Sequence, residues 1–229
     1  MDDLAVPPVS GPFIDEKARD RLLVSGPDAL VYLHSQVAQD VEAMAVGESG
    51  WTLVLEPSGK VVALARITRS GDDVFALDTD AGFGEVLADR LRRFKIRVDA
   101  DIALESAADG ASDPSPAAES ARVALGWPRM GAEIVPGKTI PGSTGVMSGA
   151  VSFTKGCYPG QELVERMDSR GAEAPRSLRV VDVGPDAQPG DAVLDDDGNT
   201  VGELTSVAGP LAIASVRRGA TPSNLSPQT

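Results

Sequence analysis

Cysteine, histidine and aromatic residues are scarce in this chain. One cysteine, Cys157, and one histidine, His34, occur among 229 residues, with 5 Phe, 2 Trp and 2 Tyr. A single cysteine excludes an intrachain disulfide framework and a cysteine-rich metal site, so we predict no metal ligands and expect a reducing, cytoplasmic location. Apolar runs such as Val61–Ala65 are far shorter than the roughly 20 residues that span a bilayer, which predicts no membrane partner. Residues 1–12 show no signal-peptide pattern.

Basic residues are also fewer than acidic residues in this chain. The chain has 21 Lys and Arg against 34 Asp and Glu, a net charge of −13. Proteins that bind nucleic acids neutralise phosphates with clustered basic side chains, so we expect no direct nucleic-acid partner. The densest basic run, Arg90–Arg97, is interpreted as the solvated end of a helix that leads into a strand.

The first half of the chain has the pattern of an α+β domain. Hydrophobic residues make up 42% and charged residues 24%, as in ordinary globular proteins. Helical spacing and alternating apolar residues predict two helices among five strands, which favours an antiparallel sheet with packed helices. The expected strands are Arg21–Ser25, Trp51–Glu56, Lys60–Arg69, Asp73–Leu77 and Ile96–Leu104, and the expected helices are Asp28–Ala38 and Phe83–Phe94.

The sequence pattern changes twice in the second half of the chain. Residues 105–120 are small, polar and proline-containing, which predicts a loop or linker. Two short helices are expected after it, and from Arg176 onward short strands and turns predict a small β-barrel. The helices are expected at Ala121–Trp127 and Gln161–Met167, and the strands at Leu178–Val183, Ala192–Leu194, Val201–Val207 and Leu211–Val216. The predicted division is a flexible arm (1–12), a main domain (13–175), a β-barrel (176–218) and a flexible tail (219–229).

The segment that carries chemistry is Thr154–Arg170, which reads TKGCYPGQELVERMDSR. Glycine and proline flank the lone cysteine and bend the backbone around it. A thiol near a helix N-terminus, with Lys155 and Arg166 close in sequence, is placed to be a nucleophile or a metal ligand. The alternative is a buried, inert cysteine. His34 lies far from Cys157 in sequence, so no Cys–His pair is evident.

Residues 155–162, KGCYPGQE, followed by Arg166 and by Arg170-Gly171, resemble the signature of the YgfZ-like proteins, which are relatives of the glycine-cleavage T-protein. Four other stretches agree in order along the chain. They are Leu23–Val41, the hairpin Leu55–Arg69, Ile140-Pro141 before the signature, and Val201–Ser206.

The resemblance implies a folate-binding T-protein-like domain followed by a C-terminal β-barrel. It further implies an accessory role in the assembly or maintenance of iron–sulfur proteins, with those proteins or their assembly machinery as partners and tetrahydrofolate as the cofactor. Cys157 is then the reactive residue, as a thiolate, a transient cluster ligand or a contact to a partner. The residues implied to bind the cofactor or hold the loop are Lys155, Tyr158, Gln161, Glu162, Arg166 and Arg170.

Two positions depart from the T-protein pattern. Ala63 stands where T-proteins have an acid that supports aminomethyl transfer, and Ala124 stands where they have a glutamate that pairs with the pterin ring. Two alternative functions therefore stay open beside the accessory role. One is a folate-dependent one-carbon transferase of the aminomethyltransferase type, which both alanines disfavour. The other is a protein-binding module that no longer binds folate.

Overall fold

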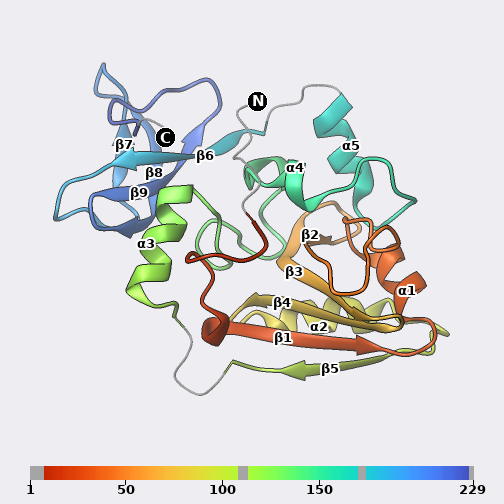
Figure 1. The fold of residues 1–229 in the computed structure, drawn as a ribbon. Coiled ribbons are helices and arrows are strands. Elements are labelled where there is room, and N and C mark those ends of the chain that lie inside the picture. Colours follow the sequence, from red (N-terminus) through yellow and green to blue (C-terminus); the bar gives the residue numbers. More distant parts are fainter. Residues whose placement is uncertain (1–7, 108–112, 170–173, 227–229) are drawn as a thin grey trace.

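The computed structural model describes residues 8–107, 113–169 and 174–226. Two antiparallel sheets organise this part of the chain, one in each half (Figure 1). The larger sheet belongs to the first half and has the strand order β2-β3-β4-β1-β5. Its strands are β1 (Arg19–Ser25), β2 (Ser49–Leu55), β3 (Val61–Gly71), β4 (Val74–Asp80) and β5 (Asp101–Glu105).

Helices cover the larger sheet because their apolar faces need burial. Helix α2 (Gly84–Arg93) contacts strands β1, β3, β4 and β5, and its Leu87 and Leu91 side chains are fully buried. Helix α1 (Ala29–Gln36) contacts β4, and its Leu33 side chain is fully buried. The remaining helical elements are η1 (Glu16–Ala18), α3 (Pro116–Leu125), η2 (Pro141–Ser143), α4 (Met147–Ala150) and α5 (Gln161–Ser169).

The second sheet forms the C-terminal part and has the strand order β6-β9-β8-β7. Its strands are β6 (Arg176–Asp182), β7 (Ala192–Leu194), β8 (Thr200–Ala208) and β9 (Leu211–Arg217). This sheet has an apolar cluster of its own, which includes Val181 and Val216. Helix α3 lies against β8 and β9 and joins the two halves (Figure 1).

Two segments differ from the sequence prediction. The expected linker 105–120 is shorter, because α3 already begins at Pro116, where the Ser115 side chain accepts a hydrogen bond from Ala118 N. Residues 116–120, which we expected in the linker, therefore form the first part of α3. The expected strand at 96–104 begins only at Asp101, because Arg97 has φ +56, a left-handed conformation that a strand cannot contain.

Described residues near both ends of the chain form hydrogen bonds with the sheets. Within the arm 1–12, residues 1–7 lie outside the described residues, and the carbonyl of Val9 accepts a hydrogen bond from Arg66. In the tail 219–229, Leu225 forms a bridge with Val181, and Ser226 N donates to Val180 O. The described part of the tail thus extends the C-terminal sheet. No helix in the described ranges is long and apolar enough to cross a membrane.

Candidate functional site

Cys157 lies on the loop that leads into α5, and its thiol is free and exposed. The neighbouring Tyr158 is buried, and burial raises the pKa of its phenol to about 12. Gln161, the first residue of α5, accepts a hydrogen bond at Oε1 from the backbone N of Tyr158 at 3.0 Å. The loop therefore presents the sulfur to solvent while the residues after it are fixed to the protein.

Lys155 fixes the other side of this loop. Its ammonium donates to the backbone carbonyls of His34, of Val37 at 2.7 Å and of Gln39 at 3.1 Å, just where α1 ends. An ammonium has three N–H donors, so these carbonyls use all of them. Burial lowers the pKa of Lys155 to about 8. The structure therefore places Lys155 as an anchor of the loop, whereas the sequence suggested a positive charge for the thiolate.

His34 lies beside the same loop, although it is more than a hundred residues away in sequence. A Cβ atom built on Gly156 would lie 3.9 Å from its Nε2 atom. Asp40 Oδ1 lies 3.5 Å from Nδ1, and Glu42 Oε2 lies 3.8 Å from Nε2. The structure thus brings an imidazole and two carboxylates close to the residue before Cys157. No local sequence pattern indicates this, because the contact depends on how α1 packs.

Two glycines explain why the loop and the β2–β3 hairpin fit together. Gly160 has φ +88, and a Cβ atom there would lie 2.6 Å from the carbonyl oxygen of Glu56. Gly59 has φ +85, and a Cβ atom there would lie 2.4 Å from the Leu163 Cβ. Both positions need glycine for backbone conformation and for space. Gly59 of the hairpin and Gly160 of the cysteine motif therefore lie at the same contact between these two segments.

Two other predicted residues of the motif, Glu162 and Arg166, face solvent. Glu162 and Arg166 are exposed on α5, and Arg170 lies outside the described residues. The structure thus separates the motif into inward anchors, Lys155 and Tyr158, and outward groups around the exposed thiol.

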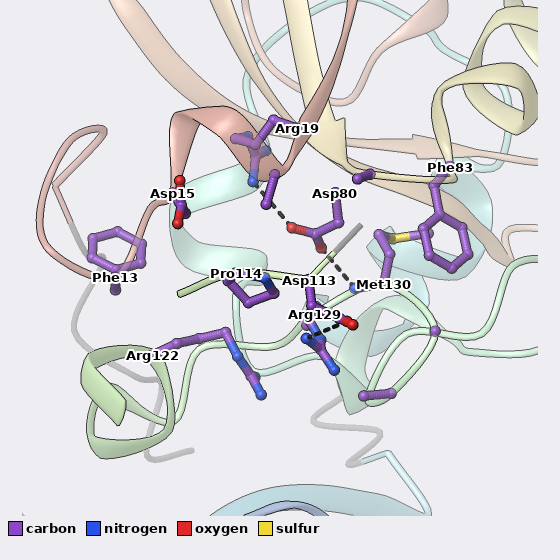
Figure 2. Close-up of a pocket in the computed structure, with 14 residues that line it drawn as sticks. Phe13, Asp15, Arg19, Asp80, Phe83, Asp113, Pro114, Arg122, Arg129 and Met130 are labelled. Carbon is purple, nitrogen blue, oxygen red and sulfur yellow. Dashed lines mark hydrogen bonds and ion pairs between the residues drawn. The ribbon is translucent and has the colours of Figure 1, made fainter. Parts of the chain in front are cut away.

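A cavity of about 240 Å³ opens elsewhere, between the N-terminal segment and the residues around α3 (Figure 2). It combines two phenyl rings with groups of both charges. Its principal lining residues are Phe13, Phe83, Arg19, Asp80, Arg129 and Met130. None of the motif residues 155–166 lines this cavity. The exposed thiol and the cavity are therefore separate features.

Strand register builds the centre of the cavity. Arg19 and Asp80 are direct partners in the antiparallel pair β1–β4. Arg19 Nη1 therefore donates to Asp80 Oδ1 at 3.1 Å, while Met130 N donates to Asp80 Oδ2 at 2.8 Å. The Arg19 side chain is only 9% exposed and also lies 3.7 Å from Asp78 Oδ1. Asp80 is thus a carboxylate held in one orientation at the cavity wall, as Figure 2 shows.

The two alanines that depart from the T-protein pattern lie outside this lining. Ala63 is fully buried within β3, and Ala124 is exposed on α3. Arg122, two residues before Ala124, does reach the cavity, but its guanidinium is occupied by Glu119 and Glu133. Neither alanine supplies an acid to the site.

Glu133 links this region to the C-terminal sheet, and sequence reasoning did not single it out. Its carboxylate is fully buried and accepts hydrogen bonds from Arg122 Nη1, Arg129 N, Thr205 Oγ1 and Ser206 Oγ. Thr205 and Ser206 belong to the Val201–Ser206 stretch of the resemblance. The structure gives these hydroxyls a physical role, because they satisfy a buried charge from the other half.

Comparisons with known proteins agree with this architecture. Residues 176–225 match the family model for the CAF17 C-terminal beta-barrel domain. The solved structure of the glycine cleavage system aminomethyltransferase T from Bartonella henselae is similar, with 16% identity and a TM-score of 0.73, over 88% of this chain and 76% of that one. No curated protein sequence matches. The predicted fold class is confirmed: a T-protein-like α+β fold with antiparallel sheets, followed by a β-rich C-terminal domain.

Proposed function

We propose that this protein is an accessory factor for iron–sulfur proteins and that Cys157 is its point of contact with them. The observation that carries the proposal is the exposure of the chain's only thiol on a loop anchored by Lys155 and Gln161. The YgfZ-like motif around Cys157 and the CAF17 match of the C-terminal domain support it.

The number of protein ligands that an iron–sulfur cluster needs limits the role of Cys157. Iron–sulfur clusters are usually held by four protein ligands, and the chain has one cysteine. Cys157 therefore acts as one ligand or one contact in a complex, while the client protein or the assembly machinery supplies the other groups. An exposed sulfur on a fixed loop suits such a shared role, because a partner can reach it without unfolding the protein.

Rescue of a bacterial strain that lacks its own iron–sulfur accessory factor tests this proposal. We expect Cys157→Ala to abolish recovery of an iron–sulfur enzyme activity, with soluble protein at wild-type amounts because the side chain is exposed. Thr154→Ala is the matched control, since Thr154 is exposed on the same loop and we expect it to rescue fully. Undiminished rescue by Cys157→Ala would overturn the proposal.

We further propose that the cavity holds the ring of a tetrahydrofolate. The residues present fit such a ring: Phe13 and Phe83 offer apolar walls, and Asp80 offers acceptor oxygens. The cavity is smaller than the roughly 300–1,000 Å³ of typical ligand pockets, so it suits the bicyclic ring rather than the whole cofactor. Tetrahydrofolate carries one-carbon units when it is bound, but Ala63 offers no group that moves a proton. We therefore propose binding without aminomethyl transfer.

A further inference from the structure

We propose that the surface around Cys157 docks a segment of a partner protein in which a basic residue stands next to an apolar one. This inference rests on the proposed role of Cys157 as a contact to iron–sulfur proteins or their assembly machinery, and it names the chemistry of the segment that reaches the thiol. The docking surface consists of residues 153–157, of Val31 and His34 on α1, and of Asp40 and Glu42 after that helix. In Figure 1, α1 and the loop that leads into α5 lie on the same side of the molecule.

Phe153 supplies the first apolar group of the docking surface. It lies four residues before the thiol, and 47% of its surface is exposed. The backbone next to it is fixed, because Ser152 N donates to Ala38 O at 2.9 Å and the Lys155 ammonium donates to the carbonyls at the end of α1. A half-exposed ring on a fixed backbone gives a partner an apolar contact without a large cost for ordering the loop.

Helix α1 supplies the second apolar group. Val31 is 65% exposed and stands three residues before His34, so the two side chains lie on the same face of the helix. The His34 imidazole lies beside Gly156, the residue before the thiol. Val31 and Phe153 therefore belong to the same surface as Cys157.

The charge around these apolar groups is acidic. The side chains of Asp40 and Glu42 are 31% and 54% exposed, and they lie 3.5 Å and 3.8 Å from the two nitrogens of His34. Lys155 is the cation nearest to the thiol in sequence, but its ammonium is directed at three backbone carbonyls. Helix α5 adds more exposed acids than bases, namely Glu162, Glu165 and Asp168 against Arg166.

This combination selects one kind of occupant. A segment that carries Lys or Arg is attracted to the acids, whereas an acidic segment is repelled. An apolar side chain next to the basic one covers Phe153 or Val31 and removes apolar surface from water. The docking surface thus fits a basic and apolar segment, with the thiol between the two kinds of contact.

Thiol–disulfide exchange with short peptides tests the inference. Each peptide carries one cysteine as a thiopyridyl disulfide, flanked by Lys and Leu, by Glu and Leu, or by Lys and Ser. The Cys157 thiolate attacks the peptide sulfur, a disulfide joins peptide and protein, and thiopyridone leaves, so the absorbance of thiopyridone reports the rate. Each rate is divided by the rate of the same peptide with a neutral small thiol, N-acetylcysteine amide.

We expect the wild type at low salt to react about tenfold faster with the Lys–Leu peptide than with the Glu–Leu peptide, because the acids concentrate a basic peptide near the thiol. We expect it to react about threefold faster with the Lys–Leu peptide than with the Lys–Ser peptide, because leucine covers apolar surface. The first preference should fall as salt is added, and the second should not.

Two double variants locate the charge effect. Asp40→Asn with Glu42→Gln removes two acids of the docking surface, whereas Asp196→Asn with Asp197→Asn removes two exposed acids from the turn before β8. Both double variants change the net charge by the same amount. We expect the first to reduce the charge preference to about threefold or less, and the second to keep it above about fivefold, because the effect of a charge fades with distance.

Phe153→Ala tests the apolar contact in the same way. We expect this variant to lose the preference for leucine over serine. Leu194→Ala is its matched control, since Leu194 is 42% exposed on β7, and we expect the control to keep the preference.

The outcomes separate the inference from the proposed function. Equal rates of the wild type with all three peptides overturn the docking surface, and so does an equal loss of charge preference in the two double variants. The wild-type rates need no variant, so a variant that fails to fold does not prevent the test. If the wild type does not distinguish the peptides while Cys157→Ala fails to rescue, only the docking surface is refuted. Undiminished rescue by Cys157→Ala refutes the proposed function, and the inference with it.

Discussion

Replacing Glu133 by glutamine changes one buried carboxylate that four donors share. In the native protein, Oε2 accepts from Arg122 Nη1 at 3.1 Å and from Arg129 N at 2.9 Å. Oε1 accepts from Thr205 Oγ1 at 2.7 Å and from Ser206 Oγ at 2.6 Å. A glutamine keeps an acceptor on only one side, where Arg122 Nη1 and Arg129 N need it. The Thr205 and Ser206 hydroxyls then face its N–H groups and lose a charged acceptor.

The expected loss of unfolding free energy is about 1–3 kcal/mol, the usual cost of leaving a buried donor without its charged acceptor. Arg122 has a side chain only 5% exposed and loses one of its two carboxylate partners, while its two hydrogen bonds to Glu119 remain. Such a loss is measurable against the roughly 5–15 kcal/mol that stabilises a typical domain.

Urea denaturation followed by tryptophan fluorescence measures the effect, with the free energy taken from linear extrapolation. Glu119→Gln is the matched control, because Glu119 also pairs with Arg122 but is 19% exposed and has no contact with the C-terminal hydroxyls. We expect the control to lose clearly less than Glu133→Gln. A loss below about 1 kcal/mol for Glu133→Gln would show that the carboxylate does not hold the two halves together.

Two further predictions concern the tyrosines and the cysteine loop. Burial raises the pKa of both Tyr32 and Tyr158 to about 12, above the value of about 10 in an unfolded chain. Because the folded protein favours the neutral phenols, their contribution to stability is complete below pH 10 and is lost as the pH rises from 10 to 12. Absorbance at about 295 nm should detect almost no tyrosinate in the folded protein at pH 10.5, whereas an ordinary titration near pH 10 would contradict the burial. Gly160→Ala should lower the free energy of unfolding by about 1–3 kcal/mol, because an alanine there combines a positive φ with a 2.6 Å contact to Glu56 O. Gly156→Ala is its control, since the nearest atom lies 3.9 Å away, and equal losses in the two variants under urea would refute the argument.

Sequence patterns predict those parts of this fold that depend on local spacing. The β2–β3 hairpin and α2 have clear alternating or helical patterns, and the structure has both within a few residues of their expected bounds. The start of α3 is different, because Ser115 and Pro116 occur equally in loops and at helix starts. Strand β5 is shorter than expected because Arg97 has a left-handed backbone conformation. The alternation of apolar side chains contains no signal for this conformation.

The site is less predictable than the fold, because its contacts join distant segments. The motif identified Cys157 as a candidate, and the structure places its thiol at the surface. The partners of Lys155 are backbone carbonyls at the end of α1, and a sequence contains no signal for a bond to a carbonyl. The pairing of Arg19 with Asp80 follows from the β1–β4 register, which is defined only once both strands are placed.

The four-donor arrangement at Glu133 also has a consequence for how the protein is made. A ribosome completes residue 133 well before Thr205 and Ser206 leave the exit tunnel. Until then the carboxylate has its partners on Arg122 and Arg129 but lacks the two hydroxyls from β8. The nascent first half thus carries an incompletely satisfied charge, and this buried contact forms only after β8 has left the exit tunnel.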